Sequence, residues 1–344
     1  MNLAYRADAS RAIGSGHVMR GLSLAQELRR RGATMRFICA DLPGAIPHVV
    51  RGQGFDCLMI PAEAARDAET TRAAIGPARL DWLLVDHYAL DAAFEGALRG
   101  MAGGIMVIDD LADRPHDCDV LLDCTEFPDA AARYAGLVPT GTRLLTGLGW
   151  ALLNDTFRRI REGLAREPGP VRRLLVTFGA NDPMGGTLRV ARILVQPKYA
   201  CLRIDLLGGL SNPQEPEVAR LVAGAGHITY AAFNDRMPEL MAAADLALGA
   251  GGTTSWERCA LGLPSLVLLL ARNQLGVSAC LERLGAARVL GMADQLSEAA
   301  IEAAIDAALA DAAWRDAASA AGMKMVDGLG IHRVAEGLLE GRWP

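Results

Sequence analysis

The sequence predicts an α/β protein built from two doubly wound, Rossmann-like domains. Short apolar runs alternate with longer helix-patterned stretches, and the alternation occurs in two blocks. The runs are apolar almost throughout, which is typical of parallel strands buried on both faces of a sheet. At 344 residues the chain is also longer than a typical single domain. We therefore expect one domain over residues 1–160 and a second over residues 171–320.

The first block predicts five strands and a well-delimited helix. Val18, Leu22, Ala25 and Leu28 recur at helical spacing, and the basic run 29–31 followed by a glycine is typical of a helix end. The helix is expected to begin at Val18. The strands are expected at residues 2–8, 35–40, 82–86, 104–109 and 120–123.

The second block follows residues 167–170, a Glu-Pro-Gly-Pro stretch that is the most linker-like part of the chain. Ligands of doubly wound domains bind beyond the carboxyl ends of the strands. Two such domains predict an interdomain cleft lined by the functional residues. The strands of this block are expected at residues 173–178, 202–207, 246–249 and 265–269.

Composition excludes several classes of protein. Hydrophobic residues make up 51% of the chain and charged residues 22%, which disfavours a disordered protein. A net charge of −5 and an aromatic content of 5% disfavour a nucleic-acid partner or a polybasic membrane anchor. The seven cysteines show no CxxC spacing, and the longest apolar run, residues 266–271, is too short to insert into a membrane. These features predict a cytoplasmic protein with reduced thiols.

A glycine turn with a histidine follows the first strand. Gly14 and Gly16 carry no Cβ, so the backbone can bend tightly and pass close to a ligand. The helix that follows directs its unpaired N–H groups and the positive end of its dipole at that position. His17 has an ordinary pKa near ~6.5, which suits proton transfer at neutral pH, and the helix start favours its neutral form. We expect His17 to be a general base.

A second glycine cluster, residues 249–257, follows the strand at 246–249. Its backbone N–H groups and hydroxyls are suited to a phosphate. Glu257 has two interpretations of about equal weight: a capping box with Thr254, or a carboxylate that binds the hydroxyls of a ribose. The cluster supplies four candidate substrate-binding residues, Gly251, Gly252, Thr253 and Thr254.

Other strand ends supply weaker candidates. Tyr88 follows the strand at 82–86 and is expected to be functional, whereas Asp110 is expected to be solvated or to cap a helix. Asn181 lies in a turn after the first strand of the second block, and Asn273 and Gln274 follow the strand at 265–269. No histidine pair has the spacing of metal ligands, so we expect no metal and no cofactor.

These motifs together resemble the pseudaminic-acid pathway hydrolases (PseG type), which cleave UDP-2,4-diacetamido-2,4,6-trideoxy-β-L-altropyranose to UDP and the sugar. The resemblance runs essentially end to end, and seven weak motifs in the same order make it specific. The motifs are residues 6–10 with 14–17 and Arg20, 85–88 with Asp91, 108–111, 178–183, 251–259 with Gly262 and Pro264, Ala271 with Asn273 and Gln274, and Asp327 with Gly328, Gly330 and Arg333.

The resemblance implies a GT-B fold and a complete set of roles. Gly251 to Thr254 would bind the diphosphate, Glu257 the ribose, and Asn273 and Gln274 the uridine or sugar. His17 would deprotonate the water that attacks the anomeric carbon with inversion. Residues 321–344 would return to the first domain. Gly14, Gly16, Arg20, Tyr88 and Asn181 complete the expected substrate contacts.

The resemblance also implies a place in nonulosonic acid biosynthesis and flagellin glycosylation, with enzymes of the preceding and following steps as possible partners. Two other functions stay open on the sequence. The first is a GT-B glycosyltransferase with a UDP-sugar donor, because a fold does not choose between water and a sugar acceptor. The second is a catalytically silent protein that binds nucleotide sugars, and hydrolysis of a different UDP-diacetamido hexose is a further variant.

Overall fold

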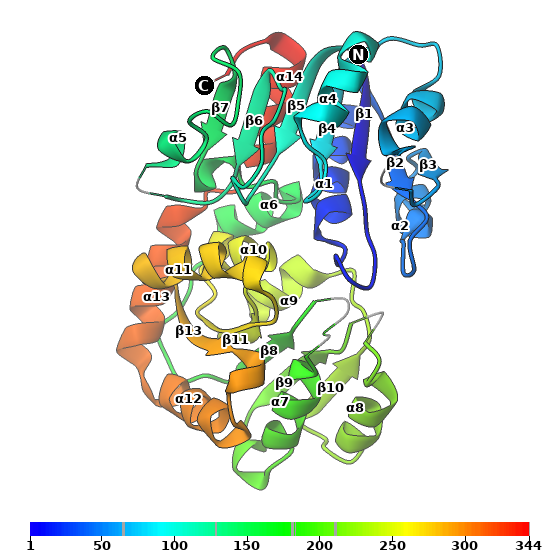
Figure 1. Cartoon of the computed structure of the whole chain (residues 1–344). Helices are drawn as coiled ribbons and strands as arrows, with labels where there is room; N and C mark the ends of the chain where they lie inside the picture. The colour runs from blue at the N-terminus through cyan, green and yellow to red at the C-terminus, as the bar shows by residue number, and fades with distance from the viewer. Residues whose placement is uncertain (64–65, 128, 180–181, 183, 210–211, 344) are drawn as a thin grey trace. The chain divides into compact units, whose positions relative to one another are not determined.

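The chain folds into two compact units in a computed structural model (Figure 1). The first unit comprises Met1–Asp155 and Gly328–Pro344, and the second comprises Thr156–Asp327. The structure describes residues 1–343 except 64–65, 128, 180–181, 183 and 210–211.

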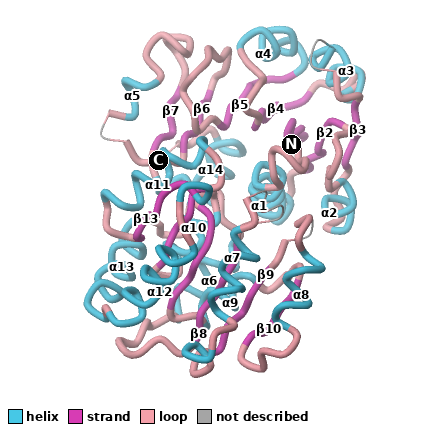
Figure 2. Tube along the Cα trace, turned by 60° about the horizontal axis from the view of Figure 1, so that its bottom comes forward, coloured by secondary structure: helices cyan, strands magenta, loops and turns pink. Residues whose placement is uncertain are grey.

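The first unit is built on a parallel sheet of seven strands in the order β3-β2-β1-β4-β5-β6-β7. Figures 1 and 2 show its strands side by side with helices around them. The strands are β1 (Asn2–Ala7), β2 (Thr34–Ala40), β3 (Cys57–Ile60), β4 (Leu80–Asp86), β5 (Ala102–Ile108), β6 (Val120–Asp123) and β7 (Arg143–Thr146). The helices are α1 (Gly16–Arg30), α2 (Pro47–Gly52), α3 (Asp67–Ile75), α4 (Ala92–Leu98), α5 (Ala130–Arg133) and α14 (Gly330–Glu340), with 3-10 turns η2 (Arg99–Met101) and η3 (Leu148–Trp150).

Both faces of this sheet are buried. Successive strand residues point to opposite faces, so Leu3 and Tyr5 join one apolar cluster and Ala4 joins the other. Helices α1, α2 and α14 supply the first cluster, and α3 and α4 supply the second. The near-continuous apolar runs in the sequence follow from this double coverage.

Helix α14 closes the first unit although it is the last helix of the chain. It packs against α1 and η3, and it is drawn in red among the blue and green elements of this unit (Figure 1). His332 contacts Glu27 on α1 at 2.9 Å and Asp155 at 2.7 Å. The indole Nε1 of Trp82 donates to the carbonyl of Leu338 at 3.1 Å, which ties α14 to β4.

The second unit has a six-stranded parallel sheet in the order β10-β9-β8-β11-β12-β13. The strands are β8 (Arg173–Thr177), β9 (Arg203–Leu207), β10 (Ile228–Ala231), β11 (Leu246–Ala250), β12 (Ser265–Leu269) and β13 (Ala287–Met292). The helices are α6 (Asp155–Gly163), which starts at the unit boundary, α7 (Gly186–Leu194), α8 (Glu215–Val222), α9 (Met237–Ala243), α10 (Thr254–Ala260), α11 (Leu275–Arg283), α12 (Glu298–Ala310) and α13 (Ala312–Met325), with η4 (Pro197–Tyr199), η5 (Arg272–Gln274) and η6 (Ala293–Gln295).

Strand order decides where a ligand can bind in each unit. The chain leaves β1 toward β2 on one side, whereas β4 lies on the other side, and β8 and β11 repeat this arrangement. Doubly wound sheets bind ligands at such switch points, beyond the carboxyl ends of the strands. The segments after β1 and β4, and those after β8 and β11, therefore occupy the ligand-binding edges.

The structure confirms the predicted fold class, with corrections to single elements. Helix α1 begins at Gly16 rather than at Val18. The strands β3, β7, β10 and β13 were not among the predicted strands, and all four lie at or near the edges of their sheets. No helix in the described parts of the chain is long and apolar enough to cross a membrane.

Candidate functional site

The turn after β1 is closed by its own backbone. Ser10 and Gly14 form an isolated antiparallel bridge, with the Gly14 N–H donating to the Ser10 carbonyl at 2.9 Å. The Ser10 hydroxyl accepts the N–H groups of Ala12 and Ile13 at 3.2 and 3.0 Å. Gly14 has a φ of +85°, a conformation that favours glycine. The turn therefore leads directly into α1, which begins at Gly16.

His17 lies buried in the first turn of α1 with 5% of its surface exposed. Its Nδ1 has no hydrogen-bond partner within the described residues. The ring of Tyr88, which follows β4, meets it edge-on with centroids 4.4 Å apart. Burial lowers the pKa of His17, and the nearby Arg20 lowers it further against the opposing effect of Asp86. The imidazole is therefore neutral at pH 7, as a general base must be.

Two buried charged residues, Arg20 and Asp86, and the half-buried Asp110 form a network beside His17. The Arg20 guanidinium bonds both oxygens of Asp86, at 2.7 and 2.6 Å, and pairs with Asp110 at 3.0 Å. The Tyr5 hydroxyl donates to Asp86 at 2.6 Å. The expectation that Asp110 is solvated or caps a helix is wrong, because β1, β4 and β5 lie side by side and bring both carboxylates to α1. Arg20 is thus engaged by carboxylates of the chain itself.

A second buried network holds the end of β1 and was missed by the sequence analysis. The Arg6 guanidinium pairs with Asp8 and with Asp67, the latter at 2.6 Å. Asp8 also contacts Nε2 of His87 at 3.0 Å, and Nδ1 of His87 accepts the N–H of Ala89 at 3.0 Å. An Nδ1 that accepts leaves the ring proton on Nε2, so His87 donates to Asp8. Both nitrogens of His87 are thus engaged, whereas Nδ1 of His17 has no partner among the described residues.

The second glycine cluster lies between β11 and α10. Gly252 and Thr253 are half-buried, and within the described residues their backbone N–H groups donate to no acceptor of the chain. The capping-box interpretation is wrong, because Thr253 is the N-cap and makes no side-chain capping bond. Burial raises the pKa of Glu257 to about 7, and Arg258 opposes this only in part. The loop thus combines open amides with a carboxyl group that is not used to cap the helix.

The remaining predicted residues differ in their engagement. The side-chain oxygen of Gln274 accepts the N–H of Leu270 at 2.9 Å, so that oxygen stabilises the turn after β12. Asn273 is exposed in the same turn. Asn181 lies outside the described residues.

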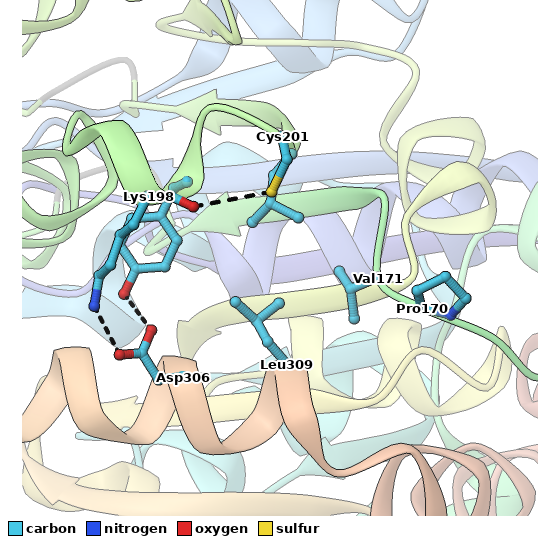
Figure 3. A pocket seen from close by; sticks show the side chains of 8 residues that line it. Pro170, Val171, Lys198, Cys201, Asp306 and Leu309 are labelled. Atoms are coloured by element: carbon cyan, nitrogen blue, oxygen red, sulfur yellow. Dashed lines mark hydrogen bonds and ion pairs between the residues drawn. The ribbon is translucent and has the colours of Figure 1, made fainter.

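A hollow in the second unit lies away from these loops (Figure 3). Its wall includes Pro170 and Val171, which precede β8, and Cys201, which precedes β9. Lys198 pairs there with Asp306 at 2.7 Å. The hollow is thus at the amino ends of the strands, opposite the edge where doubly wound sheets bind ligands. We assign no site to it.

Sequence comparisons relate the second unit to one protein family and most of the chain to two known proteins. Residues 201–328 match the glycosyltransferase family 28 C-terminal domain. A UDP-2,4-diacetamido-2,4,6-trideoxy-beta-L-altropyranose hydrolase of Campylobacter jejuni is 23% identical over 242 residues, 70% of this chain and 81% of that protein. The spore coat polysaccharide biosynthesis protein SpsG of Bacillus subtilis is 24% identical over 336 residues, 97% of this chain and 96% of that protein.

Among solved structures, MurG of Acinetobacter baumannii superposes with a TM-score of 0.69 at 14% identity, covering 98% of this chain and 99% of that one. At this identity the similarity concerns the fold. Two parallel doubly wound sheets together with this neighbour establish that the chain has the GT-B fold, and that its second unit resembles the C-terminal domain of family 28 glycosyltransferases.

Proposed function

We propose that the protein hydrolyses a UDP-activated diacetamido sugar, of the kind named for the Campylobacter jejuni relative, to UDP and the sugar. The observation that carries the proposal is His17: a buried, neutral imidazole at the ligand-binding edge of its sheet. A hydrolase needs a base that activates water, whereas binding alone needs none.

In the proposed reaction, His17 takes a proton from water through Nε2, because Nδ1 is buried. The water oxygen forms a bond to the anomeric carbon while the bond from that carbon to the diphosphate oxygen breaks. The electron pair leaves with UDP, and the configuration inverts. Tyr88 holds the imidazole ring from the side, and the Arg20 network holds the start of α1 against β4.

The loop from Gly251 to Thr254 is proposed to bind the diphosphate of the same substrate. Its open N–H groups are donors of the kind that bind phosphate oxygens, and in the transition state they would stabilise the charge that develops on the leaving UDP. Glu257 is proposed to accept hydrogen bonds from the ribose hydroxyls.

The test is release of UDP from UDP-2,4-diacetamido-2,4,6-trideoxy-β-L-altropyranose by the purified protein, followed in 18O-labelled water. We expect the label in the sugar, because the proposed attack is at carbon. Label in UDP would contradict attack at the anomeric carbon. Binding of the substrate without release of UDP would contradict hydrolysis.

A sugar transfer reaction is the second candidate, and the family 28 domain match favours it. The same loop would bind the UDP-sugar donor, and His17 would deprotonate an acceptor hydroxyl instead of water. Incubation of the donor with and without glycan or lipid acceptors separates the two. Transfer with negligible hydrolysis would replace our proposal by this one.

A further inference from the structure

Arg258 lies buried directly against the start of the glycine loop. It is 1% exposed, and its Nη2 donates to the Ala250 carbonyl at 2.8 Å and to the Ser255 hydroxyl at 2.9 Å. These two residues flank the loop from Gly251 to Thr254. Nε and Nη1 of Arg258 are buried and have no hydrogen-bond partner among the described residues. The guanidinium therefore holds the loop with one nitrogen and leaves two unsatisfied.

The other buried arginines of the chain are satisfied. Arg6 and Arg20 each pair with two carboxylates, and Arg315 donates to three backbone carbonyls. Arg258 forms no ion pair with a carboxylate of the described residues within 4.0 Å. A buried cation without a counter-ion is costly for folding. Burial accordingly lowers the pKa of Arg258 to about 10, with only partial opposition from Cys259 and Glu257.

Close packing leaves the loop little room to shift away from this cation. A Cβ on Gly249 would clash with the Thr177 carbonyl and lie 2.7 Å from Nη1 of Arg258. A Cβ on Gly251 would clash with the hydroxyl of Ser278, which is also buried and has no hydrogen-bond partner among the described residues. The open amides of the loop are thus held in place beside an uncompensated positive charge.

We propose that Arg258 is the internal counter-charge for the diphosphate of the ligand, acting through the loop rather than by direct contact. Its unpartnered nitrogens are themselves shielded from solvent, so the ligand does not touch them. The anion instead binds the loop amides, and its negative charge offsets the buried guanidinium. The inference rests on the proposed function in one respect, namely that the loop binds the diphosphate of a UDP-sugar.

This mechanism predicts that the benefit of Arg258 grows with ligand charge. Uridine carries no phosphate, UMP carries one and UDP carries two. Loss of the charge should weaken UDP by about tenfold or more, UMP by less, and uridine by less than about threefold. If the loop merely collapsed without Arg258, a substitution that keeps the positive charge would weaken UDP binding as much as one that removes it.

The experiment is calorimetric titration of UDP, UMP and uridine into the wild-type protein and into Arg258→Met and Arg258→Lys. We expect the graded loss of affinity in Arg258→Met. Arg258→Lys keeps the charge and should therefore keep most of the wild-type preference for UDP over UMP and uridine. The matched control is Arg166→Met. Arg166 lies in the same unit, donates to carbonyls near the amino end of β11, and has a pKa lowered to about 10 by burial. The Arg166→Met substitution should lower the folding stability of the protein without changing the ratio of its affinities for UDP and uridine.

Unchanged UDP affinity in Arg258→Met, or equal loss for all three ligands in both Arg258 variants, would overturn the inference. Absence of UDP binding by the folded wild-type protein would instead overturn the proposed function. NMR decides the case in which Arg258→Met does not fold. The Nε–H signal of Arg258, assigned by its loss in Arg258→Lys, should shift with UDP and stay in place with uridine. No shift with UDP would refute the role.

Discussion

Replacing Asp86 by asparagine removes the carboxylate that links α1 to β4. Asp86 is fully buried, bonded by Arg20 through two nitrogens and by the Tyr5 hydroxyl. Burial opposes its ionisation, but the Arg20 charge, the nearby His17 and the hydrogen bonds from Arg20 and Tyr5 together outweigh burial and lower the pKa of Asp86 from 3.8 to about 2. That difference corresponds to about 2 kcal/mol of folding free energy. This stability is present above the unfolded pKa and is lost as the pH falls through 2.

At neutral pH the substitution should lower the free energy of unfolding by more than the amount given by the pKa shift. The reason is that Arg20 stays buried with Asp110 as its remaining ion-pair partner. We expect a loss of about 3 kcal/mol, the scale for breaking a buried ion pair. The gap between variant and wild type should narrow as the pH falls from about 4 to about 2, since the wild type then loses its carboxylate too. Other titrating groups occur in both proteins and cancel in the difference.

Denaturant unfolding at a series of pH values measures this gap, with the fluorescence of Trp82 and Trp150 reporting on the first unit. Asp110→Asn is the matched control. Its side chain is 18% exposed and bonds one nitrogen of Arg20, so its loss should cost less than about 1 kcal/mol. A loss below about 1 kcal/mol in Asp86→Asn, or a gap that does not narrow in acid, would refute the reasoning.

Four further predictions concern the two loops. His17→Ala should lower the rate of UDP release by roughly 10²–10⁴-fold, and wild-type turnover in that variant would remove His17 from the mechanism. In the wild type, the decline of kcat/KM in acid should be centred below pH ~6.5, because burial lowers the pKa of His17. A decline centred above that pH contradicts a neutral, buried base. Burial raises the pKa of Glu257 to about 7, so the affinity for a UDP-hexose should rise with pH across neutrality. In Glu257→Gln the affinity should not change with pH. A wild-type affinity that falls with pH contradicts a role for the carboxylate. Gly251→Ala should weaken UDP binding by tenfold or more, on the order of 1.4 kcal/mol, because the new Cβ meets Ser278. Isothermal titration calorimetry measures this loss. The control is Gly252→Ala, whose Cβ would meet no atom within 4 Å.

The sequence predicted the fold class and the position of both loops along the chain because these depend on local patterns. Continuous apolar runs are the mark of strands covered on both faces, and the glycines at 14 and 251–252 mark the chain reversals after β1 and β11. The edge strands β3 and β7 were not predicted because each is short and only partly buried, whereas β6, which is equally short, is buried throughout and was predicted. The capping-box interpretation failed because α10 begins one residue earlier than that motif requires, with Thr253 rather than Thr254 as its N-cap.

No pattern in the local sequence predicts the ion pairs around His17. Arg20 and Asp86 are 66 residues apart in the sequence, and Arg20 and Asp110 are 90 apart. A carboxylate at a strand end looks the same in sequence whether it faces water or a buried arginine. Only the order β1-β4-β5 brings these groups together, and burial then makes their pairing obligatory.

By itself, then, the sequence determined two doubly wound sheets, two glycine loops at strand ends and a histidine at the start of a helix. Tertiary structure decided which carboxylates Arg20 bonds and which nitrogen of His17 is buried. It also decided that Arg258 lies beside its loop with no counter-ion from the described residues. The physical reason is that strand and turn preferences act between neighbouring residues. Desolvation and charge pairing depend on strand order and packing, which join residues far apart in the chain.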